Sequence, residues 1–142
     1  MRVFGHPVHA MVVAFPVTLL LLAPLCDGLA LMGAEPSFAK LGGLCALLGL
    51  GCAILALVTG FVDFLRLEQA TPATTTAIVH GVLAFSATSS LGTAVLLRGS
   101  GPMPTRLALT LELVAALLVV ATAWFGGHLV FHHGVGVRNQ RR

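Results

Sequence analysis

The chain has 142 residues, of which 57% are hydrophobic and only 9% are charged. A soluble domain carries about 25% charged residues, so this composition excludes a water-exposed globular protein and predicts an integral membrane protein. The formal net charge of +3 is too small to indicate binding to nucleic acid, and we expect none. We relate it instead to membrane topology and to lipid headgroups.

Four stretches of the sequence lack charged residues, and each exceeds the roughly 20 residues that cross a bilayer as a helix. The first is too long for a cleaved signal peptide, so we expect it to be retained. Proline- and glycine-rich segments separate the stretches and predict helices over about 7–30, 38–67, 72–97 and 105–133. Short loops force antiparallel neighbours. We therefore expect one all-α domain, a four-helix up-down membrane bundle with both termini on the same side.

All six histidines fall at one end of this predicted bundle, the end that holds both termini. Ionisable groups inside a membrane are costly and suggest function, and imidazole is the commonest metal ligand. His80 is the deepest, about 12 Å below the start of its helix at 1.5 Å per residue. We take this end as the candidate site. Its histidines and one acid are His6, His9, Asp63, His80, His128, His132 and His133.

Three kinds of site are compatible with this set. The first is a b-type haem held by two axial imidazoles. The second is a zinc, copper or iron ion held by three or four ligands, drawn from His6, His9, His80, His128 and His133 with Asp63. The third is a proton relay or a structural polar network without metal.

We favour haem b, because glycines and arginines accompany the histidines. The glycines could make room for a flat macrocycle, and the arginines could bind its propionates. These residues are Gly60, Gly81, Gly126, Gly127, Arg2, Arg66 and Arg138.

For the axial pair we expect His80 with one of His9, His128 or His133. Asp63 is expected to orient an imidazole N–H as its acceptor, or to pair with Arg66. His6 and His132 are more typical of hydrated residues at the membrane edge.

Two acids lie at the opposite end of the predicted bundle. Glu112, about seven residues into the last helix, is expected to pair with Arg106 or Arg98 at the membrane surface, or else to serve a proton or ion step. Asp27 ends the first helix and is expected to cap it or to pair similarly.

No catalytic residues are indicated. The sequence has no Ser-His-Asp pattern at usable spacing, no H-E-x-x-H and no phosphate-binding loop. It also lacks the C-x-x-C-H of covalently attached haem, and its three cysteines are expected to act as small hydrophobic residues. We therefore expect an electron carrier or accessory subunit rather than an enzyme.

Three segments of the chain are similar to a known family. They are His6-Pro7-Val8-His9 with Phe15-Pro16 and Asp27, then Gly60-Phe61-Val62-Asp63, and last the run from Trp124 to Val137 that holds Gly126, Gly127, His133 and Gly134. Over essentially the whole chain, they resemble a bacterial family of small four-helix membrane proteins, domain of unknown function family 2231. Some members are joined to Rieske or cytochrome domains, which implies membrane redox work. The sequence departs from the family pattern at His128, where an acid is expected, and at His132, where a basic residue is expected.

The resulting prediction is a b-type cytochrome-like electron-transfer protein or subunit of the bacterial cytoplasmic membrane. It would pass electrons between a quinone or another membrane partner and a redox protein. The alternatives are a non-redox accessory subunit of a larger membrane complex and a histidine-rich membrane protein that binds zinc, copper or iron. Five arginines at the histidine end, against three basic residues at the other, favour cytoplasmic termini.

Overall fold

The computed structural model describes residues 2–3, 6–98 and 103–137. Its described part contains four helical spans long and apolar enough to cross a membrane, Val8–Leu31, Ser37–Phe64, Pro72–Arg98 and Arg106–Phe131. The predicted all-α membrane bundle is confirmed. The spans lie close to the ranges expected from the sequence. A small antiparallel ladder of β1 (Arg2–Val3) and β2 (His6–Pro7) precedes them.

The first span is divided into α1 (Val8–Val12) and α2 (Ala14–Leu31). Proline has no N–H, and its ring clashes with the carbonyl four residues earlier. For Pro16 that carbonyl belongs to Val12, the last residue of α1. The break therefore follows from Pro16. Pro24, by contrast, lies inside α2, so the helix runs through it.

The remaining spans are α3 (Ser37–Phe64), α4 (Pro72–Arg98) and α5 (Arg106–Phe131). At the start of α4, the Thr71 hydroxyl accepts from the Thr74 N–H at 3.2 Å. The Thr105 side chain likewise accepts from the Ala108 N–H at the start of α5. Such caps satisfy amide groups that have no partner within the helix.

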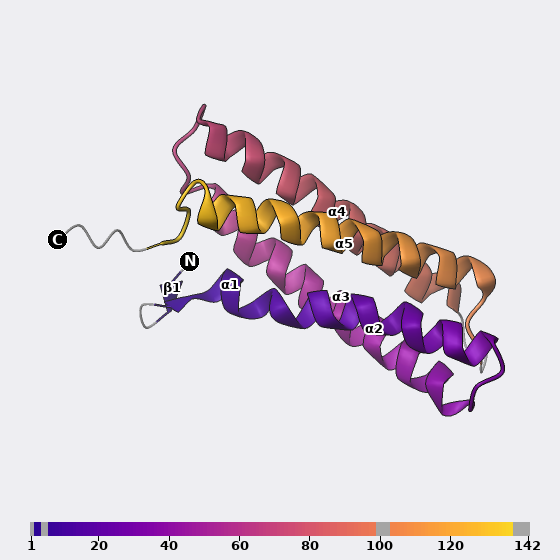
Figure 1. The fold of residues 1–142 in the computed structure, drawn as a ribbon. Helices are drawn as coiled ribbons and strands as arrows, with labels where there is room; N and C mark the ends of the chain where they lie inside the picture. Colours follow the sequence, from indigo (N-terminus) through magenta and orange to yellow (C-terminus); the bar gives the residue numbers. More distant parts are fainter. Residues whose placement is uncertain (1, 4–5, 99–102, 138–142) are drawn as a thin grey trace.

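The helices form two antiparallel hairpins packed side by side (Figure 1). The first hairpin is α1 and α2 with α3, and the second is α4 with α5. The start of α1 and the end of α5 lie at the same end of the bundle. This arrangement brings the histidine-bearing segments of the two hairpins together, as the sequence predicted.

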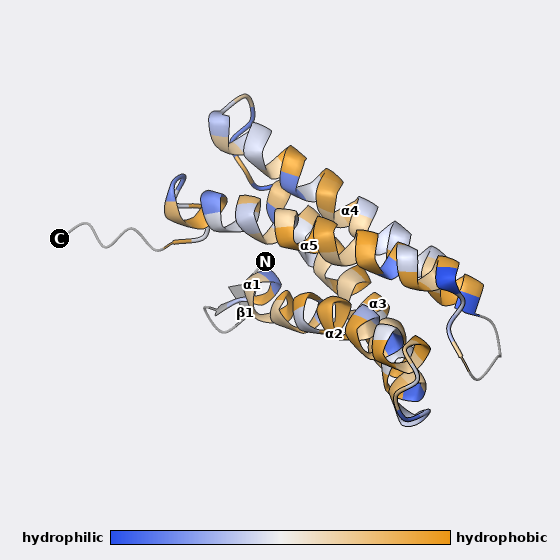
Figure 2. Cartoon of the chain, turned by 45° about the vertical axis from the view of Figure 1, so that its right-hand side comes forward, coloured by the Kyte–Doolittle hydropathy of each residue, from blue (hydrophilic) through white to orange (hydrophobic). Residues whose placement is uncertain are grey.

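Small residues dominate the interior of the bundle. Ala23, Ala46, Ala94 and Ala115 are fully buried, and the large side chains of the core cluster include Leu20. Without a hydrophobic drive between helices in lipid, small residues permit the close approach that holds membrane helices together. Large apolar side chains cover the outside instead, and hydrophilic residues gather towards the helix ends (Figure 2).

The two hairpins are related by constant intervals in the sequence. Asp27 and Arg98 are 71 residues apart, and the same interval separates His9 from His80 and Leu20 from Leu91. A second constant interval relates α3 to α5. The buried positions that it matches are Gly42 with Ala108, Gly49 with Ala115, Ala53 with Val119 and Ala56 with Thr122.

Candidate functional site

His9 of α1 is held against α3 by two features of that helix. Its Nδ1 lies 2.9 Å from the Ala56 carbonyl oxygen and 3.3 Å from the Thr59 hydroxyl. A carbonyl only accepts, so Nδ1 carries the proton and Nε2 of the neutral ring keeps its lone pair. Gly60 leaves the space for the ring, because a Cβ there would lie 2.8 Å from His9 Cε1.

His80 of α4 is held against α5 in the same way. Its Nδ1 donates to the Thr122 carbonyl at 2.9 Å, and a Cβ on Gly126 would lie 3.1 Å from His80 Cε1. Thus, in each hairpin, one histidine of the first helix is held against the second helix. In each, Nδ1 donates to a carbonyl of the second helix and the ring rests on a glycine four residues further along. The two hairpins therefore resemble each other in the way they hold a histidine as well as in their helices.

The two rings meet between the hairpins. Their centroids are 6.3 Å apart and their planes are nearly perpendicular, at 86°. Metal-binding histidines almost always donate the other ring N–H to a carbonyl, carboxylate or water, and both of these histidines do so. The His9–His80 pair is consequently the part of the histidine end best arranged for ligation.

The C-terminal histidines form a separate group. His128 and His132 stack with centroids 4.5 Å apart, and His133 stands edge-on to both at 5.1 and 4.9 Å. Nε2 of His133 lies 3.1 Å from the Thr76 hydroxyl, which itself donates to the Pro72 carbonyl. His133 therefore donates to Thr76 and ties the end of α5 to α4. Among the described residues, no ring contact joins this group to His9 or His80.

His133 lies just outside the spanning helices, and its electrostatic surroundings disfavour protonation. Desolvation lowers the pKa of His133 below its usual 6.5, and the neighbouring imidazoles of His132 and His128 lower it further. The pKa direction favours the neutral ring, whose Nε2–H meets Thr76.

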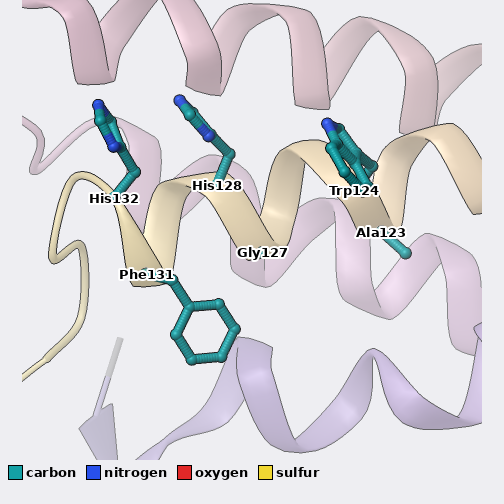
Figure 3. Close-up of a pocket in the computed structure, with 6 residues that line it drawn as sticks. All are labelled: Ala123, Trp124, Gly127, His128, Phe131 and His132. Carbon is teal, nitrogen blue, oxygen red and sulfur yellow. The ribbon is translucent and has the colours of Figure 1, made fainter.

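A shallow hollow of about 510 Å³ runs along α5 beside this group. His128, His132 and Trp124 point to one side of the helix and Phe131 to the other (Figure 3). Trp124 and Phe131 are 78% and 91% exposed, as expected of aromatic residues that meet lipid or the membrane interface.

The other residues predicted for the site are scattered around it. Asp63 is half-buried near the end of α3, whereas Arg66 is exposed just beyond it. A Cβ on Gly81 would meet nothing within 4 Å, and one on Gly127 would meet only Phe131 at 3.9 Å. Arg138 lies outside the described residues, as does the His6 side chain. At Gly60 and Gly126 the imidazoles themselves fill the space that we had expected a macrocycle to use.

Within the described ranges, no group of three or more His, Cys, Asp or Glu side chains is arranged to hold a metal ion. Zinc takes three or four ligands from the protein, and the described ranges contain no such set of donors. His9 and His80 instead form a pair of neighbouring imidazoles, each with its Nδ1 bound to a backbone carbonyl.

A second polar cluster lies towards the opposite end of the bundle. The Arg98 guanidinium of α4 binds both carboxylate oxygens of Asp27 on α2 and the Ala39 carbonyl on α3. It also lies 3.4 Å from Oε1 of Glu112 on α5. The predicted pairing of Glu112 and Asp27 with an arginine is confirmed for Arg98. The predicted surface location of Glu112 is wrong, because Glu112 and Asp27 are fully buried, and Arg106, the other predicted partner, is exposed. The 71-residue interval between Asp27 and Arg98 equals that between His9 and His80 and was the signal that could have singled out Arg98.

The family model described as "Predicted membrane protein (DUF2231)" matches residues 5–139. The chain belongs to this family. The match confirms the resemblance drawn from the histidine-proline start and the glycine-histidine end. The DUF2231 description establishes a membrane protein and states no activity. No curated protein and no solved structure matches the chain.

Proposed function

We propose that this DUF2231 protein is a small electron-transfer protein of the b-cytochrome type, with haem bound between His9 and His80. The observation that carries the proposal is the distance between the two rings. If His9 and His80 both bound one metal through bonds of about 2.0–2.1 Å, their ring centres would lie roughly 6 Å apart. The His9 and His80 centroids are 6.3 Å apart.

The number of ligands also favours haem over a simple metal ion. A porphyrin supplies four nitrogens of its own, so haem of this type would need only two ligands from the protein. The described residues offer two imidazoles with Nδ1 bound to carbonyls. Zinc needs three or four protein ligands. Among the described residues, no three His, Cys, Asp or Glu side chains are grouped to hold a metal ion.

The protein's own residues would orient and isolate the cofactor. The Ala56 and Thr122 carbonyls fix the tautomer and rotation of the two imidazoles, and both histidines are half-buried between apolar helices. Haem, when bound, supplies a one-electron iron centre. His9 and His80 would both be used to hold the haem, and we therefore expect it to serve electron transfer rather than oxygen chemistry. Arg66 and Arg138 remain candidates for the propionates.

The cellular setting is part of the same proposal. A carrier this small would exchange electrons with a membrane or redox protein, or with quinone, in the bacterial cytoplasmic membrane with cytoplasmic termini. Four apolar spans and the family match support the membrane placement, and the charge distribution supports the orientation.

A reduced-minus-oxidised absorption spectrum tests the proposal, measured both in native membranes and on purified protein with added haem. We expect a b-type α-band and about one iron per chain. Both His9→Ala and His80→Ala should abolish the band, whereas His132→Ala, an exposed histidine in the C-terminal group, should retain it.

Other outcomes would point elsewhere. A band that survives both substitutions would show that other residues bind the haem. Stoichiometric zinc or copper without a band would favour a metal-ion site. Neither band nor metal, in membranes and after haem addition, would leave a non-redox accessory subunit.

A further inference from the structure

The buried Asp27–Arg98 pair is complete without Glu112. Arg98 donates to both oxygens of Asp27, so the pair is bidentate, the strongest geometry that a guanidinium and a carboxylate form. A third Arg98 contact goes to the Ala39 carbonyl. The charges of Asp27 and Arg98 cancel each other.

The backbone of α3 is adapted to this pair. A Cβ on Gly42 would overlap the Asp27 carboxylate, and one on Gly43 would lie 2.8 Å from Arg98 Nε. The two adjacent glycines therefore let the ion pair sit directly against α3. The Asp27–Arg98 pair packs closely against α3, and Glu112 is not part of this bidentate pair.

Glu112 is a second carboxyl group in the same enclosed space. Its side chain is 0% exposed, its Oε1 makes a long 3.4 Å contact with Arg98, and its Oε2 has no hydrogen-bond partner among the residues that the structure describes. In the repeat, the position of Glu112 corresponds to buried Ala46 of α3. Packing at this position therefore does not require a carboxyl group.

We propose that Glu112 is a proton-binding site inside the membrane, which takes up and releases a proton at the end of the bundle opposite the histidines. With Asp27 and Arg98 paired, an ionised Glu112 would leave one uncompensated charge in a low-dielectric interior. A buried carboxyl in that position neutralises by binding a proton rather than bearing the cost of desolvation.

The groups around Glu112 determine its charge state. The Asp27 carboxylate on α2 would repel a second negative charge, and the Arg98 guanidinium on α4, 3.4 Å from Glu112 Oε1, would attract it. On α3, the Cys45 side chain is buried. Lys40 on α3 and Arg106 on α5 are exposed and form no ion pair with Glu112 among the described residues. The Arg98 side chain is 14% exposed while the side chains of both acids are 0% exposed, so Arg98 is the member of the cluster that reaches the surface of the bundle.

This site is independent of the haem proposal, because it lies at the other end of the helices. Infrared spectroscopy of the full chain in lipid tests it directly, since a protonated carboxyl has a C=O stretch that a carboxylate lacks. Labelling with ¹³C-glutamate shifts glutamate bands alone, which separates Glu112 from Asp27. The other glutamates, Glu35 and Glu68, are exposed.

We expect a label-sensitive protonated-carboxyl band at neutral pH that shifts in D₂O, disappears at alkaline pH and returns on reacidification. Glu112→Gln should lose the band and keep the denaturant midpoint of the wild type, whereas the control Glu35→Gln should keep the band. Absence of the band at neutral pH, or its survival in Glu112→Gln, would overturn the proposal. A band that neither shifts in D₂O nor titrates would indicate a trapped proton and would also overturn it.

Discussion

The imidazole of His9 stands edge-on to that of His80, with the two ring centres 6.3 Å apart. Each ring is fixed from behind by a backbone carbonyl of the partner helix in its own hairpin. The pair is thus positioned by two separate helix–helix contacts, and a change within one hairpin should move one ring and leave the other in place.

Gly60→Ala should displace His9. The new Cβ would lie 2.8 Å from the imidazole, against 3.1 Å for the corresponding Gly126→Ala at His80. Overpacking of this kind costs about 1–3 kcal/mol, and we expect the larger loss at Gly60. Unfolding in detergent measures the loss, and histidine NMR shifts show which ring moves.

Gly51→Ala is the matched control on α3, because its Cβ would meet nothing within 4 Å. It should be neutral or stabilise the helix by about 0.5–1 kcal/mol. Equal effects of Gly51→Ala and Gly60→Ala would mean that the His9 ring is not confined by the glycine.

Arg98→Met should strongly destabilise the bundle. The substitution removes the only partner that the structure gives the buried Asp27 carboxylate within the described residues. Breaking a buried pair in this way costs about 3–5 kcal/mol. Thermal or denaturant unfolding in detergent measures it.

The double variant Asp27→Asn with Arg98→Met should recover much of that loss, because neither charge remains. Arg106→Met, which removes an exposed arginine at the same end, should stay within about 0.5 kcal/mol of the wild type. A loss for Arg98→Met no larger than that of Arg106→Met would contradict a buried pair.

The turn after α5 should loosen as the pH falls. Burial, and then the His132 and His128 imidazoles, lower the pKa of His133 below 6.5. The unfolded chain then binds more protons than the folded one between the two pKa values, so stability falls as pH falls through about 6.5 and levels off below the folded pKa.

Proton titration by NMR with labelled histidine measures this effect. His132→Ala should raise the pKa of His133 towards 6.5, because it removes a neighbouring imidazole. A His133 pKa at or above 6.5 in the wild type would contradict the prediction.

Pro16→Ala should join α1 and α2 into a continuous helix. The alanine N–H can donate to the Val12 carbonyl, which the proline prevents. Hydrogen exchange should show new protection at residue 16, and the His9 signals should shift because α1 is re-aimed. Pro24→Ala lies where the helix is already continuous and should leave His9 unchanged; a His9 shift only in that variant would refute the role of Pro16.

Sequence reasoning predicted the four helices well because charge-free length and proline–glycine breaks are local signals. It also placed Asp27, Arg98 and Glu112 at one end and the histidines at the other. It could not choose between His9, His128 and His133 as the partner of His80. That choice depends on how each helix is rotated about its axis and on the break at Val13, and neither is encoded in hydropathy.

The burial of Glu112 was beyond sequence reasoning for a related reason. An acid seven residues into a helix can reach the surface or stay inside, according to which face the neighbouring helices cover. Here the Gly42–Gly43 pair lets the Asp27–Arg98 pair approach α3, and the acid remains enclosed. The 71-residue spacing of His9 with His80 and of Asp27 with Arg98 was visible in the sequence and would have indicated which residues face one another.

The two hairpins are similar but not identical, and a symmetric dimer of one hairpin could not hold the same polar residues. If two identical hairpins assembled as a symmetric dimer, the position of Asp27 and Arg98 would hold either two acids or two arginines, and like charges would oppose each other across the interface. Two histidines suffer no such conflict, because identical neutral imidazoles can share one ligand. Joining two unlike halves in one polypeptide keeps the matched histidines at one end and permits opposite charges at the other.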